Sequence, residues 1–238
     1  MISMTSLFEM KMEFHPAECP GCGNQCEKAL FGKGVRFFCD SCALDEKQRM
    51  RDESRRIECL AMAQAVIPAI YRETLKPELV CRDYLPALDL NPAKSFALVG
   101  QSNTGKTRVA YHMVRKAAEM GLKPFAVTSM AFRRAVSDRS AEGGKELIKA
   151  ATVAQVLLLD DLGKGAGTET ADEALLELLN TRRDRSRTTY FTMNGNGKWL
   201  AKKYGSDFGT AIAMRIASMC GHGSGEPLRI FKEKTGKE

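Results

Sequence analysis

The feature that most constrains the fold is the segment GQSNTGKT, residues 100–107. It follows the apolar stretch SFALV and precedes an amphipathic stretch that ends at Gly121. A strand, a glycine-rich loop and a helix in this order form a phosphate-binding loop, in which backbone N–H groups and the amino end of the helix surround the phosphates. We therefore expect ATP to be held by Gly100, Gln101, Ser102, Asn103, Thr104, Gly105, Lys106, Thr107 and Arg108.

Two side chains of this segment have specific chemistry. Lys106 is expected to reach the β- and γ-phosphates, and the hydroxyl of Thr107 is expected to ligate Mg²⁺.

A second motif, VLLLDD, ends in two carboxylates at Asp160 and Asp161. Four consecutive apolar residues before them indicate a strand that is covered on both faces. Asp160 is then placed to hold Mg²⁺, and Asp161 to orient and deprotonate the attacking water. A third strand, residues 187–194, ends at Asn194, whose amide could reach the water or the γ-phosphate.

Helices are expected at about residues 130–139, 145–154, 170–185, 197–204 and 209–218. Because strands and helices alternate, the predicted fold is α/β, with a parallel sheet covered by helices on both faces.

Five of the eight cysteines lie between Cys19 and Cys42. Cys19 and Cys22 form one C-x2-C pair, Cys39 and Cys42 form another, and 16 residues separate the pairs. This spacing is typical of a structural Zn²⁺ site with four thiolates. Cys26 could replace Cys22 as a ligand, and a redox dithiol is the competing interpretation. Gly32 and Gly34 could turn a hairpin between the pairs, with a short strand at residues 35–38.

Residues 43–66 contain no Gly or Pro and predict a helix that is charged at first and apolar toward Val66. We expect residues 1–60 to form a zinc-binding, partner-docking module with a linker helix, and residues 61–238 to form the ATPase domain.

The net charge of +7 is concentrated near the carboxyl end, where residues 180–238 hold 12 basic and 5 acidic side chains. Such a basic region favours polyanions, nucleic acid above all. The sequence contains neither a membrane-spanning apolar run nor a recognisable secretory signal, so a cytoplasmic location without membrane association is expected.

The segment DDLGKGAGTETADEALLELLNTRRDRSRTTYFTMNGN, with the later LAKKYG and AIAMRIASMC, resembles the DnaC/DnaI/IstB group of AAA+ ATPases. The resemblance covers about residues 66–232. It implies that residues 100–107 are the Walker A loop, that Asp160 and Asp161 are the Walker B acids, and that Asn194 is the sensor-1 residue.

The resemblance also implies that Arg215 is an arginine finger presented to ATP on a neighbouring subunit. Only 23 residues follow Arg215, so we expect the chain to lack a full C-terminal lid. Arg229 is then a candidate to contribute in place of a lid arginine, although a surface position at a strand edge is favoured. Walker B ends in Asp-Asp, where many AAA+ proteins have Asp-Glu, but this group commonly shows Asp-Asp.

Within this group, helicase loaders attach a separate N-terminal domain that binds the helicase, and a zinc-bearing version occurs among Gram-positive loaders. Transposase helpers usually have a helical N-terminal segment without this cysteine pattern. The resemblance therefore implies a helicase loader that binds single-stranded DNA and the helicase, self-associates through its ATP interface and hydrolyses ATP there. The alternative within the group is an IstB-like ATPase helper of a DNA transposase. A P-loop small-molecule kinase is disfavoured by the sensor Asn and the finger Arg, and a nucleotide-gated adaptor without useful turnover stays open.

Overall fold

The computed structural model describes residues 14–29, 39–73, 75–138, 142–165, 168–225 and 227–233. The chain divides into two compact units, Met1–Arg55 and Arg56–Glu238.

The first unit contains an antiparallel hairpin of β1 (Phe14–Glu18) and β2 (Gln25–Ala29), in which Glu18 pairs with Gln25. Its turn is closed by the N–H of Cys19, which donates to the carbonyl of Asn24 at 2.8 Å. Cys19 and Cys22 therefore lie in the turn of this hairpin. The hairpin expected at Gly32 and Gly34 and the strand expected at 35–38 lie outside the described residues.

Helix α1 (Asp40–Val66) begins directly after Cys39, three residues before the predicted start. Its last part belongs to the second unit, where Cys59 and Ala63 are buried in the core. The exposed Lys123 and Glu58 pair at 2.9 Å in the same region.

The second unit is built on a parallel sheet with strand order β4-β5-β6-β3-β7. The strands are β3 (Phe96–Val99), β4 (Pro124–Thr128), β5 (Val156–Leu162), β6 (Thr188–Met193) and β7 (Ile230–Lys232). The expected α/β architecture is confirmed, and its three predicted strands are the three central ones. The edge strands β4 and β7 were not predicted.

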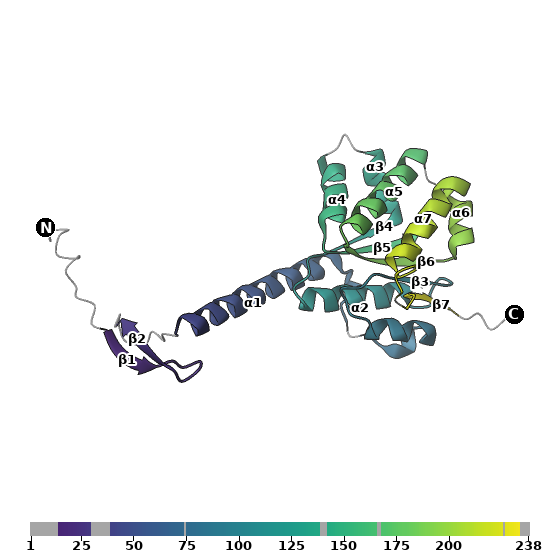
Figure 1. Cartoon of the computed structure of the whole chain (residues 1–238). Helices are drawn as coiled ribbons and strands as arrows, with labels where there is room; N and C mark the ends of the chain where they lie inside the picture. The colour runs from purple at the N-terminus through teal and green to yellow at the C-terminus, as the bar shows by residue number, and fades with distance from the viewer. Residues whose placement is uncertain are drawn as a thin grey trace. The chain divides into compact units, whose positions relative to one another are not determined.

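Helices cover both faces of this sheet (Figure 1). On one face lie α3 (Ser129–Ser137), α4 (Glu142–Val153), α5 (Glu169–Asp184), α6 (Gly197–Tyr204) and α7 (Ser206–Met219). On the other lie α2 (Lys106–Glu119) and the short 3₁₀ helices η2 (Ala69–Tyr71), η3 (Pro77–Leu79) and η4 (Arg82–Asp89). The five helices predicted after residue 130 are confirmed, with small shifts at their ends.

The strands divide their apolar side chains between two cores because successive residues point to opposite faces. In β3, Ala97 and Val99 pack with α3, α5 and α7, whereas Phe96 and Leu98 pack with α2, η4 and the end of α1. Leu157 and Leu158 of β5 divide in the same way. The sheet is therefore a rigid platform that fixes where each strand ends.

One charged side chain is part of this core. Arg182 of α5 is fully buried, and it donates to the carbonyls of Ala151, Ala154 and Thr188 and to the hydroxyl of Thr189. Burial lowers the pKa of Arg182 to about 9. The guanidinium supplies hydrogen-bond donors for the last carbonyls of α4, so it joins α4, α5 and β6.

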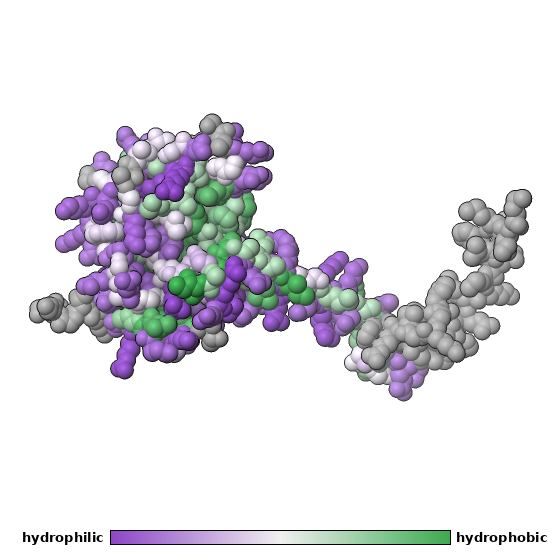
Figure 2. Space-filling model, turned by 180° about the vertical axis from the view of Figure 1, so that it is seen from behind, coloured by the Kyte–Doolittle hydropathy of each residue, from purple (hydrophilic) through white to green (hydrophobic). Residues whose placement is uncertain are grey.

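Hydrophilic side chains cover most of the face seen in Figure 2. Large apolar residues that remain exposed include Ile70, Met130, Met214 and Leu228. None of the described helices is both long and apolar enough to span a lipid bilayer.

Candidate functional site

The phosphate-binding loop connects β3 to α2, as predicted, and close packing explains its glycines. Gly105 has a φ of 87°, and a Cβ added there would lie 2.6 Å from the carbonyl oxygen of Leu79. A Cβ on Gly100 would overlap the hydroxyl oxygen of the buried Tyr84. Both positions require the absence of a side chain.

Lys106 begins α2 and folds back over the loop. Its Nζ donates to the carbonyl of Gly100 at 2.9 Å and also to the carbonyl of Gln101. The side chain is buried, and burial lowers the pKa of Lys106, against an opposing effect of the Asp161 carboxylate. The ammonium therefore lies among loop carbonyls at the point where phosphate oxygens can take their place.

Thr107 and Asp160 lie side by side. The Thr107 hydroxyl donates to Oδ1 of Asp160 at 3.0 Å, and the buried Thr192 hydroxyl donates to the same oxygen at 2.5 Å. Burial raises the pKa of Asp160, and these two hydrogen bonds oppose the rise. A hydroxyl and a carboxylate at this separation are hard oxygen ligands suited to Mg²⁺, so the residues present fit the expected metal.

Asp161 is separated from Asp160 by a change in backbone direction. The register between β5 and β6 shifts between Leu159 and Leu162, and Asp161 has a φ of 57°. Its N–H donates to the Thr192 hydroxyl at 2.9 Å, which stabilises this left-handed conformation. As a result the Asp161 carboxylate lines the cavity above the loop, where it pairs with Lys164 at 2.9 Å.

The cavity has a volume of about 360 Å³. The predicted residues that line it are Ser102, Asn103, Thr104, Gly105, Lys106, Thr107, Arg108, Asp161 and Asn194. Asn194 follows β6, and its Nδ2 donates to the Ser102 hydroxyl at 3.4 Å. Gly100, Gln101 and Asp160 lie next to the cavity through the contacts described above.

Two arginines considered from the sequence are not in this site. Arg215 lies on α7, half-buried and outside the cavity lining, and its Nε is buried without a partner among the described residues. Arg229 lies just before β7, where its Nε donates to the carbonyl of Ser95 at 2.8 Å. Because Ser95 precedes β3, Arg229 is at the opposite end of the sheet from the phosphate loop, so a contribution to the ATP site of its own chain is excluded.

Three residues around the loop, Lys164, Tyr84 and Glu233, were missed as site residues by the sequence reasoning. A fourth, Tyr71, belongs to the segment at residues 66–72, which resembles the stretch that enters the fold beside the adenine in the DnaC/DnaI/IstB group. Tyr71 and Lys164 line the cavity; the Tyr71 ring stacks on Tyr111 at 5.2 Å and has the Arg108 guanidinium 5.5 Å from its centre. Tyr84 donates to the carbonyl of Val99 at 3.1 Å, and the Glu233 carboxylate accepts from the Gln101 N–H at 2.7 Å. Lys164 belongs to the DDLGK motif, so the sequence could have identified it as a site residue. No sequence pattern indicates that Tyr84 contacts Val99 or that Glu233 contacts Gln101.

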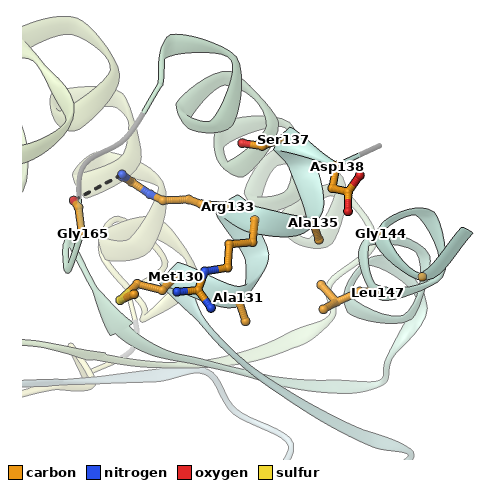
Figure 3. A pocket seen from close by; sticks show the side chains of 11 residues that line it. Met130, Ala131, Arg133, Ala135, Ser137, Asp138, Gly144, Leu147 and Gly165 are labelled. Carbon is orange, nitrogen blue, oxygen red and sulfur yellow. Dashed lines mark hydrogen bonds between the residues drawn. The ribbon is translucent and has the colours of Figure 1, made fainter. Parts of the chain in front are cut away.

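The loop after Asp161 is anchored to the helices. The N–H of Gly163 donates to the Tyr204 hydroxyl at 2.8 Å, and Arg133 approaches the carbonyl of Gly165 at 3.5 Å. Arg133 also pairs with the buried Asp172 at 3.0 Å. Figure 3 shows Arg133 and Gly165 in the lining of a second cavity, of about 720 Å³, between α3 and the start of α4.

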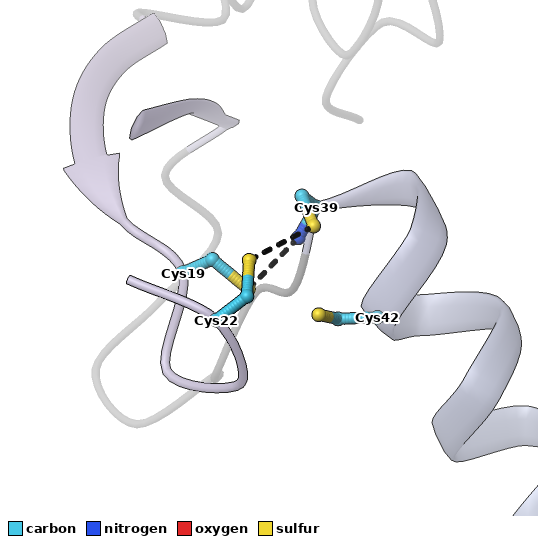
Figure 4. Close-up of side chains that lie close together, drawn as sticks. All are labelled: Cys19, Cys22, Cys39 and Cys42. Atoms are coloured by element: carbon cyan, nitrogen blue, oxygen red, sulfur yellow. Dashed lines mark hydrogen bonds between the residues drawn. The ribbon is translucent and has the colours of Figure 1, made fainter. Parts of the chain in front are cut away.

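Cys19, Cys22, Cys39 and Cys42 come together in the first unit, with all four sulfurs within 4.8 Å of one another (Figure 4). A tetrahedral Zn²⁺ site with bonds of about 2.3 Å places its sulfurs ~3.8 Å apart, and Sγ of Cys22 and Cys39 are 3.7 Å apart. The Cys39 N–H donates to Sγ of Cys19 at 3.3 Å and lowers the pKa of Cys19 to about 6, which favours the thiolate. The four residues therefore fit zinc; the side chain of Cys26 lies outside the described residues.

Comparison with known proteins gives consistent results. The sequence profile of the family described as IstB-like ATP binding protein matches residues 42–224. No curated protein sequence matches the chain.

Solved structures share the fold. The crystal structure of the DnaI has a TM-score of 0.56 and 21% identity, over 70% of this chain and 94% of that one. A protein of Streptococcus pyogenes serotype M3 described as a candidate primosome component has a TM-score of 0.54 and 19% identity, over 75% and 97%. Domain III of the replication initiation protein DnaA from Thermotoga maritima has a TM-score of 0.50 and 16% identity, over 68% and 69%.

Proposed function

Because this chain belongs to the family of IstB-like ATP-binding proteins, whose profile covers residues 42–224, we propose that it is an ATPase that loads a replicative DNA helicase. The second unit has the AAA+ P-loop fold. In this proposal the protein binds single-stranded DNA and the helicase, self-associates through its ATP sites and acts in the cytoplasm.

The residues around the loop support hydrolysis as the proposed activity. Lys106 and the loop amides bind the phosphates, and Thr107 and Asp160 would hold Mg²⁺, which would neutralise phosphate charge when bound. Asp161, which lines the cavity, orients a water and accepts its proton as the water oxygen attacks the γ-phosphorus and the bond to the β-phosphate oxygen breaks. Asn194, which lines the same cavity, would hydrogen-bond the water or the γ-phosphate.

Arg215 is proposed to complete the site of a neighbouring copy. Its Nε is buried and has no partner among the described residues, an arrangement that costs free energy in the single chain and that a partner on a second copy would relieve. Delivered to the γ-phosphate of a second subunit, such a cation stabilises charge in the transition state, which is worth about 10³–10⁵ in rate in comparable systems.

The observation that favours a helicase loader is the four-cysteine cluster of the first unit. A closed tetrathiolate site stabilises a small module and leaves no open position for catalysis. We infer that the module docks a protein partner, and that this partner is the helicase, since within the resembled group a zinc-bearing N-terminal domain belongs to loaders.

The alternative is an ATP-dependent helper of a DNA transposase. It is favoured by the matching family itself, which is described by its likeness to IstB. Under this alternative the protein would assemble on duplex DNA without a helicase.

The two functions are separated by light scattering after size exclusion. The full chain is mixed with the replicative helicase of its host, with ATP or with ADP, beside a Cys39→Ser/Cys42→Ser variant and a Cys81→Ser control. A helicase complex that is lost in the double variant and kept in the control supports the loader. Absence of that complex, together with long ATP-dependent assemblies on duplex DNA, would replace it by the transposase helper.

A further inference from the structure

A third cavity, of about 340 Å³, lies at the amino ends of the parallel strands. Ser95, Thr188 and Arg229 line it and stand at the amino ends of β3, β6 and β7, whereas Gly100, Asn194 and Glu233 stand at the carboxyl ends of the same strands. Because the strands are parallel, these two sets of residues lie at opposite ends of the sheet's strands. This cavity is therefore separate from the nucleotide site.

We propose that this cavity binds the backbone phosphates of single-stranded nucleic acid. The inference rests on the proposed function, because it assigns a surface to the DNA partner, and it concerns a site other than the ATP cavity.

The first argument is charge. Four cations line the cavity, Lys94, Arg183, Arg187 and Arg229, and no carboxylate is among its described lining residues. The nucleotide cavity, in contrast, includes the Asp161 carboxylate beside its cations. Clustered cations without a carboxylate lower the potential energy of a polyanion, so the cavity is complementary to phosphodiester groups.

The second argument is that part of the cluster is held in place. Arg229 is fixed by its bond to the carbonyl of Ser95, and Arg187 donates to the carbonyl of Ala154 at 3.3 Å. Arg183 pairs with the exposed Asp184 at 2.6 Å, which reduces the contribution of Arg183 to the positive potential of the cavity. A guanidinium held by the protein loses less conformational entropy when it binds phosphate than a free side chain does.

The third argument concerns the kind of ligand. The described lining residues include no aromatic side chain on which a base could stack, and their polar groups are cations and the hydroxyls of residues such as Ser186 and Ser218. Cations and hydroxyls contact phosphate and sugar, and such contacts position a strand without reading its sequence. We therefore expect binding with little dependence on base identity.

The test uses a Lys94→Gln/Arg187→Gln variant, which removes two charges from the cavity and none from the ATP site. Binding of a fluorescently labelled oligothymidylate is measured by anisotropy over a range of salt concentrations. The variant should bind about tenfold more weakly, and the slope of log K against log salt should fall by about 1.4, or about 0.7 for each lost phosphate contact.

The matched control is Lys145→Gln/Lys149→Gln, which removes the same charge from the exposed side of α4. It should keep the salt slope and the affinity of the wild type. ATP binding, measured with a fluorescent analogue, should be the same in all three proteins, which shows that each is folded.

Three results would overturn the inference. Equal losses of affinity in the Lys94/Arg187 variant and the control variant would assign the effect to net charge. Wild-type affinity and salt slope in the Lys94/Arg187 variant would place the DNA elsewhere and leave the proposed function intact. If that variant also lost ATP-dependent self-association, the cavity would be a contact between copies. A wild-type protein that binds ATP but no oligonucleotide would instead refute the DNA-binding part of the proposed function itself.

Discussion

The ammonium of Lys164 lies 2.9 Å from the carboxylate of Asp161, and both side chains line the nucleotide cavity. The pair neutralises the carboxylate that we propose to activate water. Lys164 also lies near enough to Lys106 that its charge helps to lower the pKa of Lys106. A triphosphate bound between these two ammonium groups would compete with Asp161 for Lys164 and release the carboxylate.

Lys164→Ala should therefore reduce the preference for ATP over ADP, because we expect this cation of the cavity lining to contact the terminal phosphate. We expect a fall of about tenfold in the ratio of the two affinities, equivalent to about 1.4 kcal/mol, measured by competition against a fluorescent nucleotide. Lys145→Ala removes a charge outside the cavity and should leave the ratio unchanged. An unchanged ratio in Lys164→Ala would mean that Lys164 does not contact the γ-phosphate.

Asp161→Asn should lower the rate of ATP hydrolysis by about 10²–10⁴ while nucleotide binding is retained. Asparagine is nearly isosteric with aspartate and tolerates the φ of 57° at this position, so the backbone turn should persist. Steady-state phosphate release and equilibrium nucleotide binding measure the two effects separately. Loss of binding as well would show that the substitution disturbs the loop, and near-normal turnover would remove Asp161 from the mechanism.

Arg215→Ala should abolish hydrolysis, by about 10³-fold or more, and leave nucleotide binding by the monomer intact. The expectation follows from its position outside the cavity of its own chain. Turnover is measured as a function of protein concentration, since a shared site requires two copies. Arg185→Ala, at the exposed end of α5, is the matched control. Normal turnover in Arg215→Ala would rule out the finger.

Arg182→Met should destabilise the second unit by about 2–4 kcal/mol, because at least three carbonyls lose a buried donor. For a unit of this size the melting temperature should fall by about 4–16 °C. Arg185→Met removes the same charge from an exposed position and should change the melting temperature by much less. Equal melting curves for the two variants would contradict the structural role of Arg182.

The purified chain should contain one zinc ion, and Cys42→Ser should reduce that content. The reason is the cluster of four sulfurs, in which the Cys39 N–H donates to Sγ of Cys19 and lowers its pKa, which favours the thiolate. Metal content is measured by plasma mass spectrometry. Cys81→Ser should retain the full zinc content, since Cys81 lies outside the cluster. If Cys42→Ser kept the zinc content of the wild type, ligation by Cys42 would be contradicted.

The sequence was most informative where chemistry is local. The loop at residues 100–107, the Asp-Asp pair and the polar end of β6 are each contiguous, so their motifs predicted both the central strands and the residues that meet at their carboxyl ends. The cysteine pairs succeeded for the same reason, because ligand spacing within each pair is fixed by local turns.

What was missed depends on contacts between distant segments. Strand β7 has three residues and β4 has five, too few for a period to be recognised, and both form because a neighbouring strand offers a hydrogen-bonding edge. Arg182 looks like one more surface charge among the arginines of residues 182–187. Its burial is decided by the end of α4, which meets it only in the folded protein.

The bond between the N–H of Gln101 and the carboxylate of Glu233 joins residues separated by 132 positions. During synthesis on the ribosome, the segment that begins the phosphate loop emerges long before the residue that holds it. The phosphate loop therefore gains this contact only when β7 has added to the edge of β3. A chain stalled before β7 would present the Gln101 N–H without its carboxylate partner.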